Sequence, residues 1–310
     1  MVKFNEALAV TRSGKNAQFV IYALGDEWGD PVPIKVEEGG KSMWNYSIPS
    51  PDDEQRRHFN AAPLLNAKRA ALNGYDVWRE RAGIRQAFTA AADTFIQHKE
   101  ENGEKIVEIW AASRDWFFEE WGRDTFIALP GLLLATGRFD EARSVIRHFA
   151  RYEQNGLIPN VIRGDMREYN NVDGSLWFIQ AIRKYYEHTG DWAFVKEMAP
   201  VIRKIVTAYR WGTPYYRYDC QNQIKMDAVD GLIMSPKQAT WMDADPEGKD
   251  QPITLRNGKA VEINALWYAA LQFMALIEYG EGNLTEARGF MDIFDKVRGS
   301  FNERFWNYRE

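Results

Sequence analysis

The charged residues that could do chemistry in this sequence stand beside tryptophans. Arg123 and Asp124 follow Trp121, and Asp243 follows Trp241 by two positions. A pyranose has apolar C–H faces that stack on aromatic rings, and hydroxyls that bind charged donors and acceptors. The pattern therefore indicates a sugar-binding site. A second explanation stays open, because the high aromatic content of 14% also suits a large helical ring whose centre is filled by big side chains.

Asp243 has the surroundings of a general acid. A carboxyl beside Trp241 and Met242 is expected to have a raised pKa and to stay protonated near neutrality, as protonation of a glycosidic oxygen requires. The alternative is an acidic, calcium-like loop or an ordinary turn. Asp245 and the residues after it have the composition of a solvated turn.

Arg123 and Asp124 form the second candidate group. An arginine–carboxylate pair offers donors and acceptors in fixed geometry and could bind adjacent hydroxyls of one glucose. The alternative is structural, with Asp124 as a helix N-cap and Arg123 as its partner.

Two further helix starts carry a carboxylate. Asp173 precedes a predicted helix and lies one helical turn before Trp177, which suits hydroxyl binding plus stacking. Glu262 opens a later helix. Asp173 could instead be a simple N-cap, and Glu262 an ordinary first-turn acid favoured by the helix dipole. In a ring of paired helices alternate helices start at one end, so these starts and the Asp243 segment are expected to converge.

The sequence shows no pattern typical of metal, cofactor or nucleic-acid binding. No cluster of histidine, cysteine and carboxylate has zinc-ligand spacing, and no glycine loop has the form of a phosphate cradle, so we expect neither a metal nor a cofactor. The net charge of −5 gives no nucleic-acid footprint. The histidines are interpreted as structural or surface residues: His58, His98, His148 and His188.

The sequence predicts a cytoplasmic protein that does not enter a membrane. Its single cysteine, Cys220, cannot form an internal disulfide and fits a reducing compartment. The first residues lack the apolar core of a signal peptide. No apolar run reaches the ~18–20 residues of a membrane span.

Two segments differ in their pattern. Residues 1–76 contain one β-prone run, 19–24, among glycines and prolines and are expected to form short strands and loops. Residues 77–310 show helical periodicity and are expected to form the main domain. The expected helices are 84–98, 124–134, 139–154, 174–188, 192–211, 261–279 and 284–301. Gly190 is expected to end the helix 174–188, and Asp191 to be the N-cap of the helix 192–211.

Residues 103–309 resemble the glucosidase domain of glycogen debranching enzymes, the amylo-α-1,6-glucosidase part. Several segments in family order are more specific than any one alone. They are Arg114-Asp115-Trp116-Phe117, Trp121-Gly122-Arg123-Asp124-Thr125-Phe126-Ile127, Gly156-Leu157-Ile158-Pro159-Asn160, the stretch 170–177, Thr240-Trp241-Met242-Asp243-Ala244 and Val261-Glu262-Ile263-Asn264-Ala265-Leu266-Trp267-Tyr268.

The resemblance implies a mainly α protein with an (α/α)6 toroid. It also implies inverting hydrolysis of α-1,6-linked glucose stubs on glycogen or a related branched α-glucan. Arg123 and Asp124 would bind glucose and Asp243 would be the general acid. Fold analogy alone does not fix the substrate, since glucoamylases and trehalases share the toroid.

The helix count departs from this family pattern. We expect about seven helices, fewer than a complete toroid needs, so the C-terminal part is expected to be missing. The second carboxylate, a base roughly 6.5–9.5 Å from the acid, would then be missing with it. Glu262 is a weak substitute. An open ring would expose apolar helix faces and favour self-association. A non-catalytic glucan-binding or assembly module is therefore one alternative function, and a related hydrolase of the glucoamylase or trehalase type is the other.

Overall fold

The computed structural model describes residues 9–13, 16–23, 32–35, 84–101, 103–112, 119–214, 223–246, 248 and 252–306. His58, Cys220, the segment 114–117 and the predicted boundary between residues 76 and 77 lie outside this part. The chain divides into two compact units, Met1–Phe88 and Thr89–Glu310.

Residues 9–13, 16–23 and 32–35 of the first unit form one small antiparallel sheet. Its strand order is β1-β2-β3, and Ala9 pairs with Val20 while Ile21 pairs with Ile34. Residues 19–23 of the predicted β-prone run therefore lie in a strand. The bounds are β1 (Ala9–Ser13), β2 (Asn16–Ala23) and β3 (Val32–Lys35).

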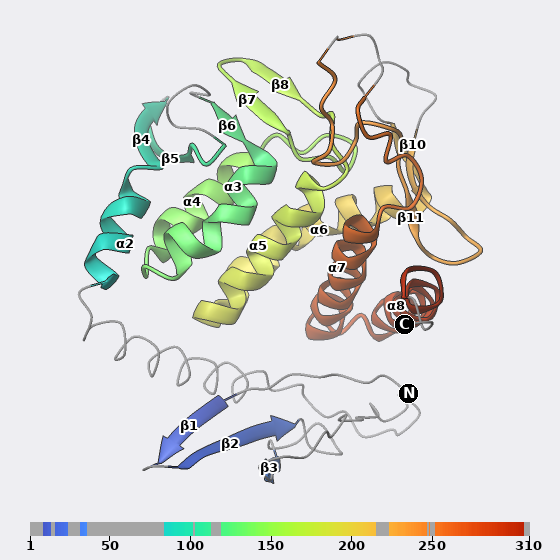
Figure 1. The fold of residues 1–310 in the computed structure, drawn as a ribbon, viewed down its shortest axis with the longest axis horizontal. Helices are drawn as coiled ribbons and strands as arrows, with labels where there is room; N and C mark the ends of the chain where they lie inside the picture. The colour runs from blue at the N-terminus through green and yellow to red at the C-terminus, as the bar shows by residue number, and fades with distance from the viewer. Residues whose placement is uncertain are drawn as a thin grey trace. The chain divides into compact units, whose positions relative to one another are not determined.

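The second unit is mainly helical, which confirms the predicted fold class (Figure 1). Its helices pack side by side, as expected for part of an (α/α) toroid. Helix α3 packs on α5, α5 on α7 and α7 on α8, while α4 and α6 lie against α5. The α-helices described are α2 (Ile84–Asp93), α3 (Gly122–Leu129), α4 (Phe139–Ala150), α5 (Gly174–Thr189), α6 (Trp192–Trp211), α7 (Val261–Gly280) and α8 (Leu284–Phe305), with a π-helical turn, η1 (Pro130–Leu134), after α3.

Local sequence explains how α5 and α6 join. Gly190 ends α5 in the left-handed conformation, at φ 71°, which glycine adopts without steric cost. Asp191 then caps α6, because its side chain accepts a hydrogen bond from the Phe194 N–H at 3.0 Å. The predicted N-cap is confirmed. This tight turn brings α6 back along α5.

The core of the helical unit is aromatic as well as aliphatic. Phe126 of α3 makes edge-to-face contacts with Phe149 of α4 and Phe178 of α5, with ring centroids 4.9 and 5.2 Å apart. All three side chains are fully buried. These contacts fix α3 against both neighbouring helices, and so fix the residues at its start.

One predicted helix is wrong in its second half. The helix expected to continue to residue 98 ends at Asp93, and a hairpin follows: β4 (Ile96–Glu101) pairs with β5 (Glu104–Ile109). Gly103, at φ 79°, lies in the turn between them. Ile96 and Ile109 pair across the hairpin and are both buried, so tertiary packing decides the conformation here. The helix expected near Asp124 also begins earlier, at Gly122.

Short strands lie where α3, α5 and α7 begin (Figure 1). One sheet has the order β6-β7-β8 and another the order β11-β10-β9. The strands are β6 (Glu120–Trp121), β7 (Val161–Arg163), β8 (Met166–Glu168), β9 (Thr213–Pro214), β10 (Gln223–Met226) and β11 (Ile233–Met234). Among the described helices, none combines the length and the apolar character needed to cross a membrane.

Candidate functional site

A buried ion pair joins the starts of α3 and α5. Arg123 Nε donates to Asp173 Oδ2 at 2.7 Å, and the two side chains are 10% and 2% exposed. Asp173 occupies the N-cap position of α5, but its side chain makes no capping hydrogen bond there. Asn171 Oδ1 instead accepts from the Gly174 N–H at 2.8 Å. Asp173 is thus left for Arg123, and the purely capping interpretation is wrong.

Arg123 also brings the Asp243 segment to the helix starts. Its Nη1 lies 3.9 Å from Asp243 Oδ2. The Asp243 side chain is 30% exposed, so it borders solvent while Asp173 does not. Arg123, Asp173 and Asp243 come from positions far apart in the sequence and meet as predicted. We call these three residues and Asp124 the Arg123 cluster.

Asp124 lies in the first turn of α3, whose N-cap position is held by Trp121. The alternative interpretation of Asp124 as the N-cap is therefore wrong. Burial raises the pKa of Asp124, and the negative charges of Asp173 and Asp243 act in the same direction while Arg123 opposes them. Burial likewise raises the pKa of Asp173, against the attraction of Arg123. The cluster holds more carboxylates than positive charge, which favours proton sharing or a hydrogen-bond-donating ligand.

Two polar atoms of the buried pair remain without a hydrogen bond. Arg123 Nη2 and Asp173 Oδ1 are both buried and find no partner among the residues that the structure describes. One is a donor and the other an acceptor. Buried polar atoms are normally satisfied, so the pair is suited to a ligand that offers both functions.

The start of α3 is set by a close backbone approach. The Gly122 N–H donates to the Asn160 carbonyl at 2.8 Å. A Cβ at Gly122 would lie 2.2 Å from the Pro159 carbonyl oxygen, so only glycine fits. Asn160 Nδ2 in turn donates to Asn170 Oδ1 at 2.9 Å. Sequence reasoning did not assign Asn160 or Asn170, although both lie in the segments that carried the family resemblance.

The predicted aromatic residues occupy different settings. Trp121 is part of β6 and half-buried. Trp177 is half-buried and follows Asp173 by one turn, its N–H donating to the Asp173 carbonyl at 2.8 Å. Trp241 is 54% exposed. The Trp241 ring is thus accessible from solvent two residues before Asp243.

Glu262 lies in the first turn of α7, as predicted, and forms an ion pair with Arg256 Nη2. Arg256 Nη1 also lies 3.6 Å from Met242 Sδ. Sequence reasoning missed Arg256, since nothing in its local pattern separates it from a solvated loop residue. One of the two Glu262 oxygens is engaged by a guanidinium, which makes Glu262 less suited to be the free base.

Comparisons with known proteins indicate the family of the chain. The family model described as amylo-alpha-1,6-glucosidase matches residues 90–310. A glycogen debranching enzyme of Saccharomyces cerevisiae is 29% identical over 236 residues, covering 60% of this chain and 15% of that protein. The chain therefore matches only a small part of this relative's length.

Among solved structures, a rhamnosidase from Klebsiella oxytoca with rhamnose bound is similar at 15% identity and a TM-score of 0.47. The match covers 64% of this chain and 35% of the rhamnosidase chain. The family match has a stronger basis, because it spans well over half of the chain and includes every residue of the Arg123 cluster. The chain belongs to the amylo-alpha-1,6-glucosidase family.

Proposed function

We propose that the helical unit is a glycoside hydrolase domain that removes α-1,6-linked glucose from glycogen or a related branched α-glucan. Arg123, Asp124 and Asp173 bind the terminal glucose, and Asp243 donates a proton to the glycosidic oxygen. Family membership and the similarity to a glycogen debranching enzyme support the substrate class.

One observation carries the binding role: Arg123 Nη2 and Asp173 Oδ1 are buried without a hydrogen-bond partner in the described part of the chain. A hydroxyl can both accept from a guanidinium and donate to a carboxylate. Adjacent hydroxyls of one glucose therefore match the two atoms. Asp124 adds a third charged side chain. Because its pKa is raised, its carboxylate is more basic and accepts a stronger hydrogen bond from a hydroxyl.

The acid role of Asp243 is supported by its position at the border of the cluster. It shares Arg123 with Asp173 but is 30% exposed, whereas Asp173 is 2% exposed. A leaving-group oxygen attached to a long glucan must reach the acid from solvent, and Asp243 satisfies that condition. With an inverting mechanism, the α-linked glucose would be released as the β anomer.

The test is glucose release from a branched limit dextrin, with isomaltose as the small substrate. Asp243→Asn should lower the rate by roughly 10²–10⁴-fold, because a positioned acid contributes about that much. Isomaltose binding, followed by calorimetry, should stay within about twofold, since the asparagine keeps the shape of the site. Proton NMR of the first product should show β-glucose.

Asp245→Asn is the matched control, because it removes a carboxylate two residues further along the same segment. It should keep wild-type turnover. Full turnover in Asp243→Asn would remove Asp243 from the mechanism. Binding of isomaltose by the wild-type chain without any glucose release would assign the chain to the alternative, a glucan-binding module.

A further inference from the structure

Two hydrogen bonds lie within the segment that carries Asp243. Gln238 Nε2 donates to the Asp243 carbonyl at 3.3 Å, and the Met242 N–H donates to Thr240 Oγ1 at 3.3 Å. Both hydrogen bonds are long and come from the same segment. An acid that must stand at a defined distance from the glycosidic oxygen needs a firmer support.

A neighbouring segment, residues 252–260, supplies that support. The Ile253 N–H donates to the Ala244 carbonyl at 3.1 Å, one residue after the acid. Arg256 Nη1 lies 3.6 Å from Met242 Sδ, one residue before the acid. Asp243 is thus bracketed by two contacts from one segment.

The Arg256 side chain connects this bracket to the helical core. Its Nη2 forms an ion pair with Glu262, which belongs to the first turn of α7. Two residues further along α7, Asn264 is fully buried. Its Oδ1 accepts a hydrogen bond from the Ile233 N–H, and its Nδ2 donates one to the Ile233 carbonyl. The flat, forked guanidinium can contact a sulfur with one amino group and a carboxylate with the other, which a lysine ammonium at the same place does less well.

The backbone around Arg256 is held in an unusual conformation. Arg256 has φ +45°, a left-handed value that a non-glycine residue rarely adopts. Two residues on, Gly258 exchanges two backbone hydrogen bonds with Ser235, at 2.8 and 3.0 Å. Such strained conformations persist where the surroundings fix them, and they concentrate at functional sites.

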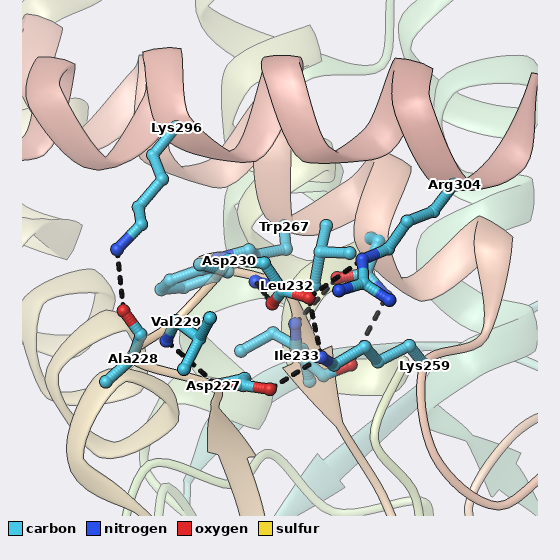
Figure 2. A network of polar contacts seen from close by, with 12 residues as sticks. Asp227, Ala228, Val229, Asp230, Leu232, Ile233, Lys259, Trp267, Lys296 and Arg304 are labelled. Carbon is cyan, nitrogen blue, oxygen red and sulfur yellow. Dashed lines mark hydrogen bonds and ion pairs between the residues drawn. The ribbon is translucent and has the colours of Figure 1, made fainter.

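Lys259 anchors the end of the segment (Figure 2). Its Nζ lies 2.6 Å from both Asp227 Oδ2 and Asp230 Oδ2. The Asp230 side chain is 6% exposed and also forms an ion pair with Arg304 of α8, with 3.0 Å between Arg304 Nε and Asp230 Oδ2. The segment is therefore tied at Ser235, Asp227 and Asp230, so that Arg256 is presented from a fixed base.

We propose that Arg256 is a positioning residue for Asp243: through Met242 and Glu262 it sets where the acid stands relative to Arg123. The inference rests on the proposed acid role of Asp243. It adds a residue that acts through another, since Arg256 holds the segment and does not itself transfer the proton.

The test compares Arg256→Gln and Arg256→Lys with the control Arg147→Gln. Arg147 also forms an ion pair with a glutamate, Glu197, through two hydrogen bonds of 2.6 Å each, but between α4 and α6. The first readout is the NMR chemical shift of the Met242 methyl group and of the Asp243 backbone amide in the isotope-labelled full chain. The two signals are assigned with the variants Met242→Leu and Asp243→Asn. Both chemical shifts should change in Arg256→Gln, change less in Arg256→Lys and stay unchanged in Arg147→Gln.

The second readout is kinetic, with isomaltose as substrate. Arg256→Gln should lower kcat by on the order of 10–100-fold with KM within about twofold, because a displaced acid affects the transition state and not ground-state binding. Arg256→Lys should recover part of the loss. A raised KM with unchanged kcat would overturn the positioning role and make Arg256 a ligand-binding residue.

The two readouts separate this inference from the proposed function. If the wild-type chain releases no glucose, the proposed hydrolysis fails, whereas the methyl and amide signals still report whether Arg256 holds the segment. If both signals in Arg256→Gln keep their wild-type positions, the positioning role is wrong even when the wild-type chain is fully active.

Discussion

The two sides of the Arg123 cluster are built differently. On one side, Arg123 and Asp124 project from the first turn of α3 and Asp173 from the N-cap position of α5, and both helices have fully buried side chains. On the other, Asp243 projects from an irregular segment next to Trp241, which is 54% exposed. The helical side is largely shielded from solvent and has fixed geometry. The Asp243 side stays open to solvent and is supported by one backbone hydrogen bond and one side-chain contact from residues 252–260.

This difference suits the two proposed tasks. Recognition of a glucose requires donors and acceptors at fixed positions, and the helix starts supply them. Delivery of a proton to the bond between the terminal glucose and a long glucan requires an accessible acid, and the irregular segment supplies it. Binding and chemistry are therefore expected to respond separately to substitution, which the following predictions examine from the largest effect to the smallest.

Arg123→Met should have the largest effect on stability. It leaves the buried Asp173 carboxylate without its partner, and breaking one side of a buried pair costs about 3–5 kcal/mol. The free energy of unfolding in urea measures the loss. Arg147→Met is the control, because its pair with Glu197 is over 40% exposed on both sides and should cost about 1 kcal/mol or less. Equal losses in the two variants would contradict the contrast between a buried and an exposed pair.

Asp124→Asn should change how stability depends on pH. Because burial raises the pKa of Asp124, the folded chain takes up a proton more readily than the unfolded chain. The stabilisation by Asp124 is present below the unfolded pKa of about 4 and is lost as the pH rises through the folded pKa. Relative to the wild type, Asp124→Asn should therefore gain stability between pH 4 and pH 7, as followed by urea midpoints.

Asp191→Asn provides a control of opposite sign. Burial alone would raise the pKa of Asp191, but the Phe194 N–H, the Tyr185 hydroxyl and Arg143 hold it below its ordinary value. Its stabilisation is present above pH 4 and is lost as the pH falls through the folded pKa. The free energy of unfolding that Asp191→Asn loses relative to the wild type should therefore become smaller in acid. Parallel pH profiles for the two variants would show that the pKa of the half-buried Asp124 carboxyl is not raised as described above.

Trp241→Ala should have the smallest effect on stability, within about 0.5 kcal/mol, because the ring is largely exposed. Its effect should appear in binding instead. Loss of a stacking contact of about 0.5–1.5 kcal/mol corresponds to an isomaltose affinity lower by roughly 2–12-fold. Trp306→Ala, an exposed tryptophan after α8, is the control and should leave binding unchanged. Equal affinities in both variants would remove Trp241 from the sugar-binding side.

The sequence was informative where local rules act alone. Asp191 after Gly190 predicted both the end of α5 and the start of α6, because capping and left-handed glycine depend on neighbouring residues only. The meeting of Arg123, Asp173 and Asp243 could also be predicted, since alternate helices of a helical ring start at the same end. The family resemblance supplied the roles, which stay predictions until they are measured.

The sequence was uninformative where partners are distant. It paired Arg123 with its neighbour Asp124, whereas the structure pairs it with Asp173, fifty residues away. It continued a helix through residues that form β4, because a helix and a half-buried strand compete closely over so short a stretch. Arg256 could not be found, since its importance comes from two contacts, with Met242 and Glu262, and from a backbone angle that no side-chain pattern reveals.

Gly122 has a consequence for how such a site can diversify. The start of α3 is docked by main-chain atoms, through the hydrogen bond to Asn160 and the close approach to Pro159. The main chain beneath Arg123 and Asp124 therefore keeps its place whatever side chains those positions carry. Proteins that share this glycine can therefore differ in the side chains that contact the sugar while the backbone at the start of α3 keeps its position. The selectivity for the sugar can then change without a change of fold.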